Sequence, residues 1–162
     1  MKSLTKIRQA IRTSTIAIIC INIFAMVVSV LTTWGMIVSL NNIDQIALTD
    51  PVLADTIKGS ATPTFFISII IAIIVLIVIS FLCFQNLKRL KQNEMVKKLP
   101  YYIGIGYYLI NIAASLVFML SANQMSMPSL IVQFVLIALY SFTLYKVTEL
   151  ENNTTQEETQ EI

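Results

Sequence analysis

The chain has no histidine, only two cysteines and few charged residues. Charged side chains make up 12% of the 162 residues, about half of the ~25% that is usual in soluble domains. Cys20 and Cys83 both lie in apolar segments, so they do not form an extracellular disulfide framework. Without histidine or a second cysteine nearby, zinc and haem sites of the usual ligand types have no ligands. We therefore expect no metal and no other cofactor.

Three long stretches carry no charge at all: Thr13–Ile43, Gly59–Leu87 and Leu99–Tyr145, of 31, 29 and 47 residues. A helix needs about 20 apolar residues to cross the hydrocarbon core of a bilayer. The three stretches therefore predict one, one and two crossings. We expect an all-α integral membrane protein with four transmembrane helices in an antiparallel up-down bundle. This composition excludes a soluble enzyme or a nucleic-acid-binding protein.

The expected spans are residues 15–40, 64–87, 101–120 and 128–145, preceded by a basic lead at 1–14. The first apolar stretch is too long for the core of a secretory signal peptide and no convincing cleavage site follows it, which favours an uncleaved span. An extracytoplasmic loop at 41–63 contains a predicted short helix, 51–58. Asp50 suits its N-cap, Pro51 its first turn and Gly59 the position just after its end.

The remaining segments are polar. Residues 88–100 form a basic cytoplasmic loop, which we expect to begin as a helical extension and to stop before Pro100. Residues 121–127 form a short outer link. The tail at 146–162 has five glutamates and no aromatic residue, so we expect it to be disordered and solubilising. The alternatives are a tail that folds back on the basic loop and a tail that recruits a basic partner.

The distribution of lysine and arginine predicts the orientation, because these residues favour the cytoplasmic side. The basic lead holds four of them and the loop at 88–100 holds five, whereas the loop at 41–63 holds only Lys58. Both termini are therefore expected in the cytoplasm. The 26 isoleucines are compatible with an AT-rich bacterial genome, and we expect a multi-pass protein of the bacterial cytoplasmic membrane.

No catalytic constellation is evident, and we expect no catalytic residues. The four spans contain no acid, base or histidine that could act as a proton relay. The first span lacks the buried glutamate of small four-span multidrug exporters, and cysteine pairs typical of four-span disulfide-forming proteins are absent. Asp44, Asp50 and Asp55 crowd into one loop without the pattern of lipoprotein signal peptidases. An enzyme using these aspartates is the weakest hypothesis.

Polar side chains inside the spans are the first set of candidate contacts. We interpret them as the packing seam of the bundle, because small residues and amides join helices in lipid; a polar cavity or ligand path is the alternative. Asn22 and Asn111 lie about 12–15 Å deep by the ~1.5 Å rise per residue, and we predict that they meet. The candidates are Asn22, Ser29, Asn111, Ser115 and Gln133.

The basic loop is the second candidate site. Its lysines and arginine enforce topology, and they could also bind anionic lipid headgroups or a cytoplasmic partner, at about 1 kcal/mol per basic residue. The residues are Lys88, Arg89, Lys91, Lys97 and Lys98.

Together these features predict a small non-enzymatic membrane protein that acts through protein contacts in the bilayer, as an accessory, regulatory or immunity-type subunit. Its expected partners are the lipid bilayer and another membrane protein or further copies of itself, with no nucleic acid. The alternative is a small transporter or channel that works as a homo-oligomer, because four helices enclose little lumen.

Overall fold

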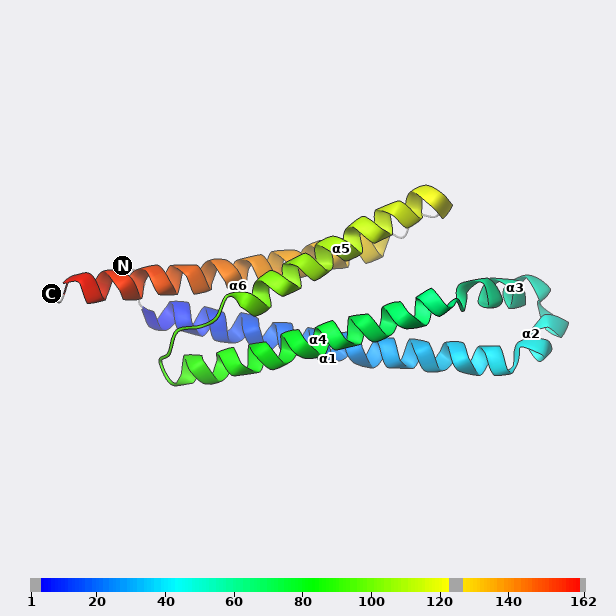
Figure 1. Ribbon diagram of the computed structural model, residues 1–162, viewed down its shortest axis with the longest axis horizontal. Coiled ribbons are helices and arrows are strands. Elements are labelled where there is room, and N and C mark those ends of the chain that lie inside the picture. Colours follow the sequence, from blue (N-terminus) through cyan, green and yellow to red (C-terminus); the bar gives the residue numbers. More distant parts are fainter. Residues whose placement is uncertain (1–3, 123–126, 161–162) are drawn as a thin grey trace. The chain divides into compact units, whose positions relative to one another are not determined.

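The computed structural model describes residues 4–122 and 127–160, and their side chains over 4–117 and 130–154. Within these ranges the chain is all helical, with six helices and no strand. Two helices and part of a third are long and apolar enough to cross a membrane: Leu4–Asn41, Pro63–Lys91 and Leu130–Thr154. The elements are α1 (Leu4–Asn41), α2 (Ile43–Thr49), α3 (Pro51–Ser60), α4 (Pro63–Lys91), α5 (Leu99–Ala122) and α6 (Met127–Gln160) (Figure 1).

The isoleucine- and valine-rich sequence of α4 shows why these segments are helical. Such residues are poor helix formers in water, but in lipid the backbone must satisfy its own hydrogen bonds, and a helix does so within one segment. The chain divides into two compact units. We call Ile21–Val78 the hairpin unit, and Met1–Cys20 with Ile79–Ile162 the terminal unit.

The hairpin unit runs along the second part of α1, through α2 and α3, and back along the first part of α4 (Figure 1). Asp50 caps α3, because its carboxylate accepts a hydrogen bond from the Leu53 amide at 2.9 Å, as the Asp50–Pro51 pair predicts. The expected end at Gly59 is wrong. The helix continues to Ser60 with Ala61 as its C-cap, and no glycine in the described chain has a positive φ.

In the terminal unit, α5 and α6 approach each other closely at Gly104. A Cβ built on Gly104 of α5 would lie 2.1 Å from Cε1 of Tyr140 on α6. The Tyr140 ring is fully buried and lies 5.8 Å, between centroids, from the Tyr108 ring. The missing side chain at Gly104 thus lets α5 approach the aromatic ring of α6 closely.

The acidic tail differs from the expectation. We expected residues 146–162 to be disordered, but α6 continues without a break to Gln160. Val147 and Leu150 are buried, with 2% and 5% of their surface exposed, and Glu151 forms an ion pair with Lys98. Burial of two apolar side chains one turn apart stabilises this part of the helix. Such burial cannot be recognised from the composition of the tail alone.

The connection between α4 and α5 begins, as predicted, with a helical extension of α4 that stops before Pro100, but Pro100 is not the residue that ends it. The helical extension of α4 ends at Lys91, well before Pro100, and α5 begins at Leu99. Asn93 has a φ of 60°, a left-handed conformation that asparagine tolerates better than most residues, and it turns the chain away from the helix. The predicted outer link at 121–127 falls largely on residues 123–126, which lie outside the described residues.

Candidate functional site

A buried polar cluster lies where α1, α4 and α5 meet in the terminal unit. The Tyr101 side chain is fully buried at the start of α5. Its hydroxyl lies 2.9 Å from Oγ1 of Thr15 on α1 and accepts a longer, 3.4 Å hydrogen bond from Nδ2 of Asn86 on α4. Thr15 and Asn86 are also buried, at 0% and 3% exposed. Three helices are therefore joined through one phenolic oxygen.

Asn86 extends this cluster to the α4–α5 connection. Its amide nitrogen donates to the Lys97 carbonyl at 2.7 Å, and its amide oxygen accepts from the Lys97 N–H at 3.0 Å. One side chain thus pairs with both backbone groups of a non-helical residue. Because a buried side chain holds both backbone groups of this exposed residue, Asn86 fixes the position of the connection against α4.

Next to this cluster, α1 and α4 form a groove with four basic side chains, which we call the basic groove. Its volume is about 750 Å³. None of the described residues that line it is acidic. They are Thr5, Arg8, Gln9, Arg12, Ile16, Phe84, Leu87, Lys88, Leu90 and Lys91.

The lining of the basic groove changes from charged to apolar along both helices. On α1, Arg8, Arg12 and Ile16 follow one another at four-residue steps, which places them on one face about 6 Å apart along the axis. On α4, which supplies Lys88 at the same end, Phe84 lies one turn deeper. Ile16 and Phe84 are 42% and 56% exposed. The groove therefore has a cationic end and an open apolar end.

The structure divides the predicted basic site. Only Lys88 and Lys91 line the basic groove. Arg89 is half-buried and is not part of the lining, Lys97 is exposed and held through its backbone, and Lys98 forms an ion pair with Glu151. The five side chains therefore do not gather in one place.

The residues that complete the groove, Arg8 and Arg12, come from the N-terminal lead. We had assigned them only to topology. The signal that links them to Lys88 is their position in the sequence: Arg12 directly precedes one charge-free stretch and Lys88 directly follows another. Two adjacent antiparallel spans bring such boundaries to the same depth. The Nε atom of Arg8 is buried and has no hydrogen-bond partner among the described residues.

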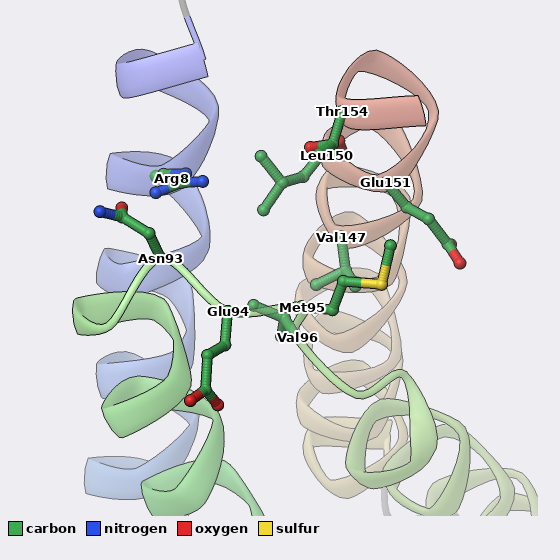
Figure 2. Close-up of a pocket in the computed structure, with 9 residues that line it drawn as sticks. All are labelled: Arg8, Asn93, Glu94, Met95, Val96, Val147, Leu150, Glu151 and Thr154. Carbon is green, nitrogen blue, oxygen red and sulfur yellow. The ribbon is translucent and has the colours of Figure 1, made fainter. Parts of the chain in front are cut away.

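A second, smaller cavity of about 50 Å³ lies between the start of α1, the α4–α5 connection and α6. Figure 2 shows Arg8 on α1 and Leu150 and Thr154 on α6 around it, with Asn93 beside Arg8 and the Glu94 carboxylate turned away from that arginine. The cavity has room for one or two water molecules. Arg8 lines both this cavity and the basic groove.

The predicted intramembrane polar residues are distributed over both units. Asn22, fully buried, and Ser29, half-buried, lie on α1, and Ser29 donates to the Ala25 carbonyl at 2.9 Å. The Asn111 amide donates to the Tyr107 carbonyl of its own helix at 2.9 Å. Ser115 and Gln133 are half-buried. The pairing of Asn22 with Asn111 stays a prediction.

Sequence reasoning overlooked Asn86 among the polar residues of the spans, although it lies within the predicted span 64–87. Its position two residues before Lys88, the first residue of the basic loop, was the available signal, because an amide at that depth is close enough to the interface to bind a connecting loop. Among the described residues, no group of three or more histidine, cysteine, aspartate or glutamate side chains could hold a metal ion. No family model, curated protein or solved structure matches the chain.

Proposed function

We propose that the chain is a multi-pass protein of the bacterial cytoplasmic membrane with four spans and both termini in the cytoplasm. The fourth span in this proposal is α5. Its 24 residues correspond to about 36 Å of helix at ~1.5 Å per residue, enough for a ~30 Å hydrocarbon core. It contains no charged residue. The excess of lysine and arginine in residues 1–14 and 88–100 supports the orientation.

Within that topology, we propose a non-enzymatic accessory, regulatory or immunity-type subunit that acts by packing against another membrane protein. The observation that carries the proposal is how α1 uses its hydroxyl groups. Ser29, Thr33 and Ser39 each donate to a carbonyl one turn earlier, at 2.9, 2.8 and 2.9 Å. A hydroxyl has a single donor hydrogen. These small side chains therefore use their donor hydrogens within the helix, which suits close helix packing in lipid better than it suits donating to a polar solute.

The surface of the hairpin unit supports the same role. Between Ile21 and Val78, only Asn22, Ala54 and Leu76 are buried. Phe24 and Trp34 on α1 are 69% and 65% exposed. A helical hairpin with so little internal burial leaves long apolar faces for contact with other helices or with acyl chains.

The test is affinity purification after mild solubilisation, combined with crosslinking before lysis. A stoichiometric membrane partner is the expected result. A protein that runs alone in every detergent, with no crosslinked neighbour, would contradict the proposal.

Gly35 offers a sharper form of this test. A Cβ at Gly35 would meet nothing within 4 Å, and the same holds for Gly106 on α5. Gly35→Leu should therefore leave the chain's own fold intact while obstructing a helix packed on that face of α1. Gly106→Leu is the matched control. Loss of the partner with Gly35→Leu alone supports packing on that face, whereas equal recovery with both variants excludes that face.

A homo-oligomeric transporter or channel is the competing function, and liposome flux separates the two. The purified chain alone should not conduct ions or polar solutes above the rate of empty liposomes. Flux that Asn111→Leu abolishes would replace the accessory role by transport, because Asn111 is the amide on the polar face of α5.

A further inference from the structure

We propose that the basic groove binds the phosphate headgroup of an anionic phospholipid, with an acyl chain lying over Ile16 and Phe84. This site is separate from the packing faces of the hairpin unit. It depends on the chain lying in a membrane and not on the identity of any protein partner.

Charge is the first argument. Arg8 and Arg12 from α1 and Lys88 and Lys91 from α4 line one groove, and no acidic residue is among the described residues of its lining. Neither Arg8 nor Arg12 takes part in an ion pair within the described chain. Four like charges around one groove repel one another, and a phosphate relieves that repulsion while accepting several charge-assisted hydrogen bonds.

Arg8 adds a specific requirement. Its Nε atom is buried and lacks a hydrogen-bond partner among the described residues. A guanidinium group has five N–H donors in a planar fork, which matches two oxygens of one phosphate. A phosphodiester in the groove would accept charge-assisted hydrogen bonds from this fork.

Depth is the third argument, and it distinguishes a lipid from free phosphate. Arg12 and Lys88 stand at the ends of two charge-free stretches, Thr13–Ile43 and Gly59–Leu87. The headgroup region of a bilayer lies at such boundaries. Ile16 and Phe84 continue the groove on the apolar side and are 42% and 56% exposed. A ligand that fits both ends is amphipathic, with its negative charge at one end.

The test compares the wild-type chain with two doubly substituted variants of equal net charge and with a third that keeps the wild-type charge. Arg12→Gln/Lys91→Gln removes two charges from the groove. Lys6→Gln/Lys97→Gln removes two charges from outside the groove. Lys6 lines a separate depression with residues of α6, and Lys97 lines neither the basic groove nor the smaller cavity. Binding is measured by native mass spectrometry of the detergent-solubilised protein titrated with phosphatidylglycerol or with phosphatidylcholine. Circular dichroism confirms that each variant is folded.

Phosphatidylglycerol should bind more tightly than phosphatidylcholine. The groove variant should bind phosphatidylglycerol about 30-fold more weakly. This factor follows from about 1 kcal/mol of binding free energy per basic residue and about 1.4 kcal/mol per tenfold change in affinity. The variant outside the groove should stay within about twofold of the wild type. Arg12→Lys/Lys91→Arg, which keeps the charge, should retain most of the binding.

Three results would overturn the proposal. Equal binding of the two lipids would show that charge does not select the ligand. Equal losses in the groove variant and in its control would show that net charge, and not the groove, attracts the lipid. Displacement of the lipid by millimolar inorganic phosphate would identify the ligand as a free anion.

Discussion

Replacing Asn86 with leucine removes the side chain that holds the α4–α5 connection while keeping a similar volume. Two hydrogen bonds to the Lys97 backbone are lost, at 2.7 and 3.0 Å. Each is worth about 1 kcal/mol net. The 3.4 Å bond to the Tyr101 hydroxyl is long and adds little, and that hydroxyl keeps its partner Thr15. Because Lys97 is exposed, water can replace part of the hydrogen bonding that its backbone loses, and we expect the free energy of unfolding to fall by up to about 2 kcal/mol.

The assay is reversible unfolding in mixed micelles with SDS as the denaturant, followed by circular dichroism. Gln85→Leu is the control, since Gln85 precedes Asn86 on α4 and is exposed. Hydrogen exchange gives a local readout: the Lys97 amide should exchange at least tenfold faster in Asn86→Leu and unchanged in Gln85→Leu. A stability loss below about 0.5 kcal/mol, or an unchanged Lys97 exchange rate, would refute the reasoning.

Three further predictions concern the packing. Gly104→Ala should cost about 1–3 kcal/mol, because a Cβ there overlaps a buried ring, whereas Gly106→Ala, with nothing within 4 Å, should cost nothing; equal effects in SDS unfolding would contradict the close α5–α6 contact. Leu150→Ala should cost about 2–3 kcal/mol and lower the helix content measured by circular dichroism, and unchanged values would mean that the α6 extension does not depend on this burial. Asn22→Leu and Asn111→Leu should be non-additive by about 0.6–2 kcal/mol if the two amides meet, and additive losses would reject their contact.

The helices that are long and apolar enough to cross a membrane could be predicted from sequence because one physical rule governs such segments. A bilayer core excludes charge and leaves backbone groups no partner outside the segment. The charge-free stretches Thr13–Ile43 and Gly59–Leu87 therefore identify α1 and α4 by simple counting. The Asp50 cap was predictable for a similar reason, since it depends on neighbours in the chain.

The acidic extension of α6 was not predictable in the same way. Its composition is typical of disordered tails, and its helix is supported by contacts with residues far away in the sequence. Lys98, 53 positions before Glu151, is its ion-pair partner, and Arg8 lines a cavity with Leu150. Contacts at such separations depend on the tertiary arrangement, which local periodicity does not encode.

The basic groove was predictable only in part. Sequence reasoning placed Lys88 and Lys91 together because they are close in the chain, and for the same reason it included Lys97 and Lys98. In the structure, Arg8 and Arg12 of α1, and not Lys97 and Lys98, line the groove with Lys88 and Lys91. The prediction assumed that residues close in sequence are close in space, and this assumption fails where a loop such as the α4–α5 connection turns away from the helix.

The number of membrane crossings is the central claim, and cysteine labelling tests it most directly. In a background with Cys20→Ala and Cys83→Ala, single cysteines replace Asp55 in α3, Asn93 in the α4–α5 connection and Asn152 in α6, all of them exposed positions. With four spans, a membrane-impermeant thiol reagent added to intact cells labels Asp55→Cys alone, and labels the other two only after permeabilisation. Labelling of Asn152→Cys from outside, with Asn93→Cys protected, would mean three crossings and would contradict the account.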